Sequence, residues 1–349
     1  RQRQMCIRDR YPRCAGAALY VKEGFSSERW SVIVGLLVVA AAFVSSAAIV
    51  NGFIAYLGEF IELDRFTAII VVTLVIGAIA AWGIAESVSI AAFVTVVEIA
   101  GLLLVIAVSY SGLAELPDRW RQLVPATDSA GWYGICAGSL LAFYAFIGFE
   151  DMVEVAEETR QVRRNLPIGI MFTLAITTLL YMAIMVTAVM AMPPEKLAQS
   201  PVPLARLYEH YMGSDATIIS IIGLFALING ALIQVILASR VLYGMSSRNL
   251  LPAILSRVNQ HTQTPLVATA LSTFSILLLA VSGTLATLAE VTSLIMLVVF
   301  SLVNLSLLKV KRKHPKPEGL IVFPLIIPLL GFLVSAGFVV LEIVDLIGV

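Results

Sequence analysis

Long apolar stretches recur along this chain, and they limit its possible folds more than any other feature. A helix needs about 20 predominantly apolar residues to cross the hydrocarbon core of a bilayer. We expect membrane-spanning helices over residues 30–57, 66–84, 87–109, 132–150, 166–192, 216–244, 265–283, 285–308 and 323–347. The sequence therefore predicts an all-α integral membrane protein with about nine transmembrane helices.

The composition supports a membrane protein and offers no sign of a metal or redox site. Hydrophobic residues make up 59% of the chain and charged residues 13%, whereas soluble domains contain about 25% charged residues. Cysteines and histidines are scattered, without the spacing of a disulfide framework or a metal site. They are Cys6, Cys14, Cys136, His210, His261 and His314. We expect no cofactor, no bound metal and no nucleic-acid partner.

Residues 1–10, RQRQMCIRDR, differ from everything that follows them. They are rich in arginine and contain no apolar region, so they do not form a signal peptide. They resemble the short translated-adapter sequences found at the ends of assembled fragments, and we exclude them from the fold. Residues 11–349 contain no linker or low-complexity stretch, which predicts a single membrane domain.

Basic residues are unevenly divided between the two sets of loops that alternate along the chain. One set includes the segments KVKRKHPKPEG and ETRQVRRN and contains most of the lysines and arginines. The opposite set contains Arg65, Arg119, Arg121, Lys196 and Arg206. Because basic loops remain on the cytoplasmic side, the richer set is expected inside the cell. The chain is therefore expected to be a multi-pass protein of the cell membrane.

The stretch Leu141–Pro167, LAFYAFIGFEDMVEVAEETRQVRRNLP, changes from apolar to acidic and then to basic without a turn signal. Gly148 lies inside its aromatic run. Four glutamates then follow the spacing of one helical face, namely Glu150, Glu154, Glu157 and Glu158. Carboxylates at membrane depth are costly, and a broken helix is tolerated there only where it lines a cavity. We expect the helix to loosen near Gly148.

The segment FYAFIGFEDMVEVAEETRQVRRNLPIGI resembles the sixth-helix signature of the amino acid–polyamine–organocation (APC) permeases. Tyr11–Phe25 is similar to the segment after the second helix of that family, with Ala15-Gly16 where Gly-Gly is common. Ser239–Asn259 is similar to the exit of the eighth helix, and Phe323–Gly331 to the start of the eleventh, although the usual preceding arginine is missing. The resemblance covers nearly all of residues 11–349. It implies a fragment that begins at the third helix and lacks the first two and a twelfth.

The resemblance implies an APC/LeuT-like inverted-repeat bundle, in which residues 30–109 pair with 216–308 and residues 132–192 lie between them. It also implies secondary active transport of an amino acid by alternating access, as proton-coupled symport or exchange. Such transporters bind substrate near the midplane, between discontinuous helices. Their half-helix ends offer backbone donors to a carboxylate and free carbonyls to an ammonium. The expected partners are the small-molecule substrate, protons and the lipid bilayer, while the oligomeric state stays open.

The resemblance places part of a substrate site in the sixth helix. Tyr144 matches the aromatic gate above the substrate, and the Ala145 carbonyl would face the amino group. Ile147 would line the side-chain pocket, and Gly148 would supply backbone freedom. In the eighth helix, Gln234 aligns with a pocket position.

The aromatic side chains around Gly148 have two readings. Phe143 and Phe146 belong to the expected substrate-binding segment, and Phe149 follows directly after Gly148. Each of the three could equally pack against lipid or the protein core.

Two carboxylates are candidates for gating or coupling. Glu98 lies in VTVVEIAGLLLVI, the expected fifth helix, where several proton-coupled relatives have lysine instead. A carboxylate there could accept a proton, neutralise a cation, or make a structural hydrogen bond. Glu150 matches a carboxylate implicated in the inner gate, and the alternative is an interfacial side chain. Glu290 could be an interfacial residue at the end of its helix.

Other functions remain open beside amino acid transport. A polyamine or amine permease, or a non-transporting sensor or partner subunit, would use the same fold. A membrane enzyme would need a nucleophile–base pair or a metal cluster, yet no expected span contains a histidine. Because Ala145, Ile147 and Gln234 are uncharged, we expect a neutral or small amino acid rather than a cationic one.

Overall fold

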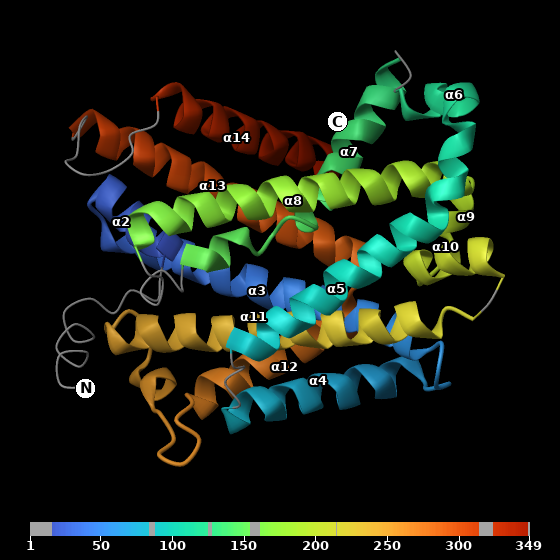
Figure 1. Ribbon diagram of the computed structural model, residues 1–349. Helices are drawn as coiled ribbons and strands as arrows, with labels where there is room; N and C mark the ends of the chain where they lie inside the picture. Colours follow the sequence, from blue (N-terminus) through green and yellow to red (C-terminus); the bar gives the residue numbers. More distant parts are fainter. Residues whose placement is uncertain are drawn as a thin grey trace.

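The computed structural model describes residues 16–83, 88–124, 128–153, 161–213, 215–313 and 324–347. These residues form α-helices and short 3-10 helices, and no β-strand occurs among them (Figure 1). The α-helices are α2 (Gly16–Phe25), α3 (Glu28–Leu57), α4 (Arg65–Trp82), α5 (Val88–Ser109), α6 (Leu116–Arg119), α7 (Ser129–Tyr144), α8 (Val162–Ala191), α9 (Pro194–Ala198), α10 (Pro203–Met212), α11 (Thr217–Ser247), α12 (Leu266–Ser282), α13 (Leu285–Lys313) and α14 (Ile326–Ile347). The 3-10 helices are η1 (Tyr110–Glu115), η2 (Trp120–Leu123), η3 (Phe149–Val153) and η5 (Ala253–Ser256).

Some predicted features lie outside the described residues. They are the segment 1–10, the first part of the Tyr11–Phe25 motif, the turn at 84–87, the basic loop at 314–323, and the residues Glu154, Glu157, Glu158 and Arg160. The helical face proposed for the four glutamates therefore stays a prediction.

Within the described part of the chain, seven helices are long and apolar enough to cross a membrane. They are α3, α4, α8, α11, α13, α14 and the segment Ala92–Ala114, which contains most of α5. The first and last residues of these helices lie within a few residues of the expected spans, with two exceptions. Both ends of Ala92–Ala114 are shifted toward the C-terminus, and α13 continues beyond its expected end. Many large apolar side chains on these helices are exposed, including Leu74 and Phe172, as expected for surfaces that contact lipid.

Two of the nine expected spans are shorter than expected. The prediction that residues 132–150 form one span is wrong, because α7 ends at Tyr144 after 16 residues. The span expected over 265–283 is α12, an apolar helix of 17 residues between Pro265 and Gly283. At about 1.5 Å per residue, helices of this length reach about 25 Å, less than the hydrocarbon core of about 30 Å.

Helix α3 runs through the middle of the bundle (Figure 1). It packs against α11, α13, α12 and α2. Its apolar residues are distributed all round the helix, which is typical of a helix buried on every side. Ala47, Ala48 and Val50 of α3 belong to a core that also includes Ile76 of α4 and Val235 of α11.

The helices α3–α5 lie against the helices α11–α13. Helix α4 packs on α11 and α12, and α5 packs on α11. Close approach is possible because small residues lie at the crossings; a side chain at Gly77 of α4 would collide with Thr273 of α12. These contacts join the two segments that were expected to pair, while their inverted-repeat relation stays a prediction.

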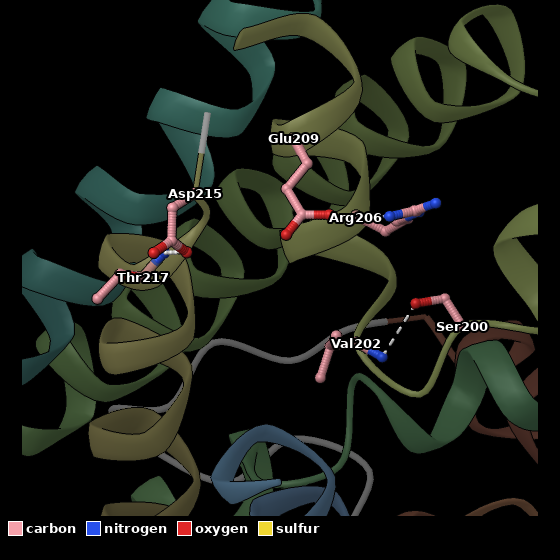
Figure 2. Close-up of polar contacts among 6 residues, drawn as sticks. All are labelled: Ser200, Val202, Arg206, Glu209, Asp215 and Thr217. Atoms are coloured by element: carbon pink, nitrogen blue, oxygen red, sulfur yellow. Dashed lines mark hydrogen bonds and ion pairs between the residues drawn. The ribbon is translucent and has the colours of Figure 1, made fainter. Parts of the chain in front are cut away.

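The loop between α8 and α11 is folded rather than extended. It contains α9 and α10, which lie with α6 at one end of the bundle, whereas α2 lies at the other (Figure 1). Three short contacts stabilise the loop (Figure 2): the Arg206–Glu209 ion pair at 3.1 Å, the Val202 N–H donating to the Ser200 hydroxyl at 3.2 Å, and the Thr217 N–H donating to the Asp215 carboxylate at 3.1 Å.

Candidate functional site

The helix α7 stops at Tyr144, and the chain continues as a non-helical turn before η3 begins at Phe149. The N–H groups of Ala145, Phe146 and Ile147 each donate to the carbonyl three residues earlier, at 3.0 to 3.1 Å. Gly148 then adopts a φ of +121°, which only glycine adopts readily. The loosening expected near Gly148 is therefore present, and it explains why α7 is short.

Glu150 folds back onto this turn. Its carboxylate accepts a hydrogen bond from the Gly148 N–H at 2.8 Å. A hydrogen bond to a carboxylate is stronger than one between neutral groups, so it stabilises the positive φ of Gly148 directly. The side chain thus closes a small ring around the point where the helix is broken.

A cavity of about 310 Å³ lies beside the break. Its walls come from α2, α3, α8, α11, α13 and the residues on both sides of Gly148. Three of the predicted site residues line it: Ile147, Glu150 and Gln234. The walls are mainly apolar, and Glu150 is the one charged residue among the described residues that line it. A mainly apolar cavity with a few polar groups is typical of small-molecule sites.

Tyr144 joins the end of α7 to α3. Its hydroxyl donates to the backbone carbonyl of Ser45 at 3.3 Å and lies 3.4 Å from the Ser45 hydroxyl. Its ring packs against the central core, while Ser45 itself lines the cavity. Tyr144 therefore lies next to the cavity wall rather than in it.

The aromatic side chains of the break pack within the protein. Phe143 and Phe149 both contact Phe300 of α13, with ring centroids 5.9 and 5.7 Å apart. Phe146 meets the ring of Tyr181 on α8 in an edge arrangement at 5.3 Å. All three rings pack against other helices, and Phe149 also lines the cavity, while the role of this segment in substrate binding stays a prediction.

Ala145 and Glu98 lie on a different side of the break. The Tyr181 hydroxyl donates to the Ala145 carbonyl at 3.0 Å. Glu98 is half-buried on α5 and interacts electrostatically with Tyr181. Neither Ala145 nor Glu98 lines the cavity. The predicted residues are thus divided into a cavity group and a group around Tyr181.

The sequence reasoning missed several residues of this region. Ser45, Thr292, Asn304 and Phe300 line the cavity, and Tyr181 contacts the break. Most of them are polar side chains inside apolar spans, a signal that could have identified them because such groups are rare in membrane helices. Among the described residues, no group of histidine, cysteine, aspartate or glutamate side chains is arranged to hold a metal ion.

Comparison with known proteins gives one family. A family model described as amino acid permease matches residues 10–346. The chain is 31% identical to the vacuolar cationic amino acid transporter 2 of Arabidopsis thaliana over 74% of its length, and 30% identical to the branched-chain amino acid permease BcaP of Bacillus subtilis over 67%. It is 29% identical to the methylthioribose transporter of Bacillus subtilis over 70% of its length.

These matches cover 41%, 49% and 52% of the three relatives, so the chain spans about half of their length. The family match extends over almost all of the chain and agrees with its apolar helices and broken sixth-helix segment. The chain therefore belongs to the amino acid permease family of the APC superfamily, a family of multi-pass membrane transporters rather than enzymes.

Proposed function

We propose that the protein transports an amino acid across the cell membrane by alternating access, as a proton-coupled symporter or an exchanger. The observation that supports this best is the helix break at residues 145–148 beside a cavity of about 310 Å³. Broken helices at a cavity are where secondary transporters expose backbone groups to substrate. The loops that contain most of the lysines and arginines would lie on the cytoplasmic side of the membrane.

The substrate ammonium would meet backbone carbonyls of the break, with Ala145 the principal acceptor. Because Ala145 does not line the cavity, the ammonium would reach its carbonyl on the Tyr181 side of the break. Tyr144 would cover the substrate, Phe143 and Phe146 would brace the segment from their partner helices, and Ile147 and Gln234 would contact the side chain. The Gly148 N–H is already bonded to Glu150. The substrate carboxylate would therefore need donors from elsewhere, which the resemblance assigns to the first helix of the family.

The two carboxylates would have separate roles. Glu150 holds the Gly148 turn in shape, so it would control opening of the cavity toward the cytoplasm. Glu98 would accept the coupling proton or balance a coupling cation. Its electrostatic interaction with Tyr181 supports this role, because Tyr181 contacts the proposed ammonium acceptor.

The side chain of the substrate is proposed to be uncharged. Ile147 and Gln234 are neutral, and one oxygen of Glu150, Oε2, is used within the protein. A cationic amino acid is the main alternative, because Glu150 faces the cavity and three of the matched relatives are named cationic amino acid transporters. Polyamine transport, methylthioribose transport and a sensor role on the same fold are the others.

Uptake by the full-length protein in proteoliposomes tests these alternatives together. The panel is radiolabelled leucine, alanine, arginine, putrescine and methylthioribose, each measured with and without an inward pH gradient, in empty vesicles and in vesicles preloaded with the same unlabelled compound. We expect saturable uptake of leucine or alanine that excess arginine inhibits weakly. Stronger inhibition by arginine than by leucine would overturn the proposed selectivity. Saturable uptake of methylthioribose alone, or of no compound, would overturn amino acid transport.

A further inference from the structure

Tyr181 contacts the helix break in two ways, and no motif in the sequence points to it. Its hydroxyl donates to the Ala145 carbonyl at 3.0 Å, and its ring packs edge-on against Phe146 at 5.3 Å with an interplanar angle of 67°. Tyr181 lies inside the long helix α8, so its position is set by a continuous element. One side chain thus fixes both the backbone and a ring of the broken segment.

The Ala145 carbonyl is the first one beyond the turn that ends α7. The carbonyls of Ala142, Phe143 and Tyr144 accept the three turn hydrogen bonds. In a continuous helix the Ala145 carbonyl would accept from the N–H four residues later. Here the chain turns away at Gly148, and the donor comes from Tyr181 instead.

A carbonyl oxygen has two lone pairs, and a single hydroxyl donor uses one of them. The remaining lone pair can accept from a second donor, and its direction depends on how the first hydrogen bond fixes the peptide plane. A substrate ammonium has three donors and needs acceptors whose directions are already set. A peptide that rotates freely would lose conformational freedom on binding, which would weaken affinity.

We propose that Tyr181 is a positioning residue of the substrate site, whose hydroxyl fixes the Ala145 carbonyl so that its second lone pair faces the substrate ammonium. This inference rests on the proposed function, in which that carbonyl is an ammonium acceptor. It adds to the site a residue that does not line the cavity, from the helix α8 that already contributes Ile170 to the cavity wall.

The position of Tyr181 also connects this site to α5. Helix α5 packs on α8, and Glu98 of α5 interacts electrostatically with the Tyr181 ring hydroxyl. Tyr181 thus interacts with both the proposed coupling carboxylate and the proposed ammonium acceptor.

The test uses Tyr181→Phe in the full-length protein, which removes the hydroxyl and keeps the ring against Phe146. Uptake is measured in proteoliposomes with the best amino acid of the panel. Inhibition by the acid that lacks its amino group is measured in parallel, isocaproate for leucine and propionate for alanine. The matched control is Tyr110→Phe, because Tyr110 is 70% exposed and lies at the start of η1.

We expect Tyr181→Phe to raise KM about 3- to 10-fold, which is the effect of one hydrogen bond, with Vmax within about twofold of wild type. Inhibition by the des-amino acid should not change, because that compound has no ammonium to meet the Ala145 carbonyl. Tyr110→Phe should match wild type in both measurements.

Three results would overturn the inference. An unchanged KM in Tyr181→Phe would show that the hydroxyl does not position an acceptor. Equal weakening of the amino acid and of its des-amino analogue would show a general structural role. Absence of amino acid uptake by the wild type would remove the proposed function and this inference with it, whereas the first two results leave the proposed function intact.

Discussion

Replacing Gly148 by alanine isolates the energetic role of the helix break. A Cβ at Gly148 would meet no atom within 4 Å, so the substitution creates no collision. Its φ of +121° nevertheless lies in a region that residues with a Cβ rarely adopt. Such a conformation costs about 1–3 kcal/mol for a residue other than glycine. The expected cost is therefore backbone strain alone.

If the alanine variant relaxes to another backbone conformation when free and must return to this one to bind substrate, the strain appears in the binding equilibrium. At about 1.4 kcal/mol per tenfold change, a cost of about 1–3 kcal/mol weakens binding about 5- to 150-fold. The assay is equilibrium binding of radiolabelled amino acid to the purified full-length protein in detergent. Thermal unfolding is measured on the same samples to show whether the strain also destabilises the fold.

Gly138→Ala is the matched control for this experiment. Gly138 lies in the same helix, α7, and a Cβ there also meets no atom within 4 Å, but its φ is not positive. Alanine is favoured over glycine within a helix by about 1 kcal/mol, so this variant should bind normally and unfold at the same or a higher temperature. Wild-type binding and stability in Gly148→Ala would refute the reasoning, because the turn would then not require its observed φ.

Three further predictions concern side chains around the break and the core. Glu98→Gln should preserve substrate binding and exchange but abolish accumulation driven by a pH gradient; unchanged accumulation with unchanged pH dependence would make Glu98 structural. Glu150→Gln retains an acceptor for the Gly148 N–H and should weaken substrate binding less than about threefold, whereas Glu150→Ala should weaken it about tenfold. Equal effects of the two variants in a binding assay would show that the hydrogen bond to Gly148 does not stabilise the binding conformation. Arg65 donates to Asn51 at 3.0 Å and to the Gly283 carbonyl at 2.9 Å, so Arg65→Ala should lower the free energy of unfolding by about 1 kcal/mol because the contact is exposed. A thermal unfolding curve that does not move would show that this contact contributes nothing.

The sequence was sufficient to locate most of the membrane helices, because a spanning helix is recognised by length and hydrophobicity alone. It also located the break, since Gly148 and Glu150 lie together inside an apolar segment. The length of α7 was overestimated for a related reason. Residues 145–150 are mostly apolar, so hydrophobicity alone extends the predicted span past Tyr144. The conformation of Gly148 shows that the helix has already stopped.

The contacts that shape the site were less accessible to sequence reasoning. The hydrogen bond from Tyr181 to Ala145 joins positions 36 apart, and that from Tyr144 to Ser45 joins positions 99 apart. Each depends on how one helix is rotated against another, which a single sequence does not specify. The hydrophobic periodicity of α3 does not show which face of the helix meets which neighbour, because the helix is apolar on all sides. Its burial depends on the helices that pack around it.

The central position of α3 has a consequence for how the chain is made. Asn51 of α3 donates one hydrogen bond to Ala47, four residues earlier, and another to Ala280 of α12, 229 positions later. The first bond pairs the Asn51 side-chain amide with a carbonyl of α3 itself. It therefore lowers the free-energy cost of placing this polar side chain in the bilayer soon after synthesis. The second bond closes only after α12 has left the ribosome. During much of translation, α3 therefore lacks the helices α11, α12 and α13 that pack against it in the folded protein.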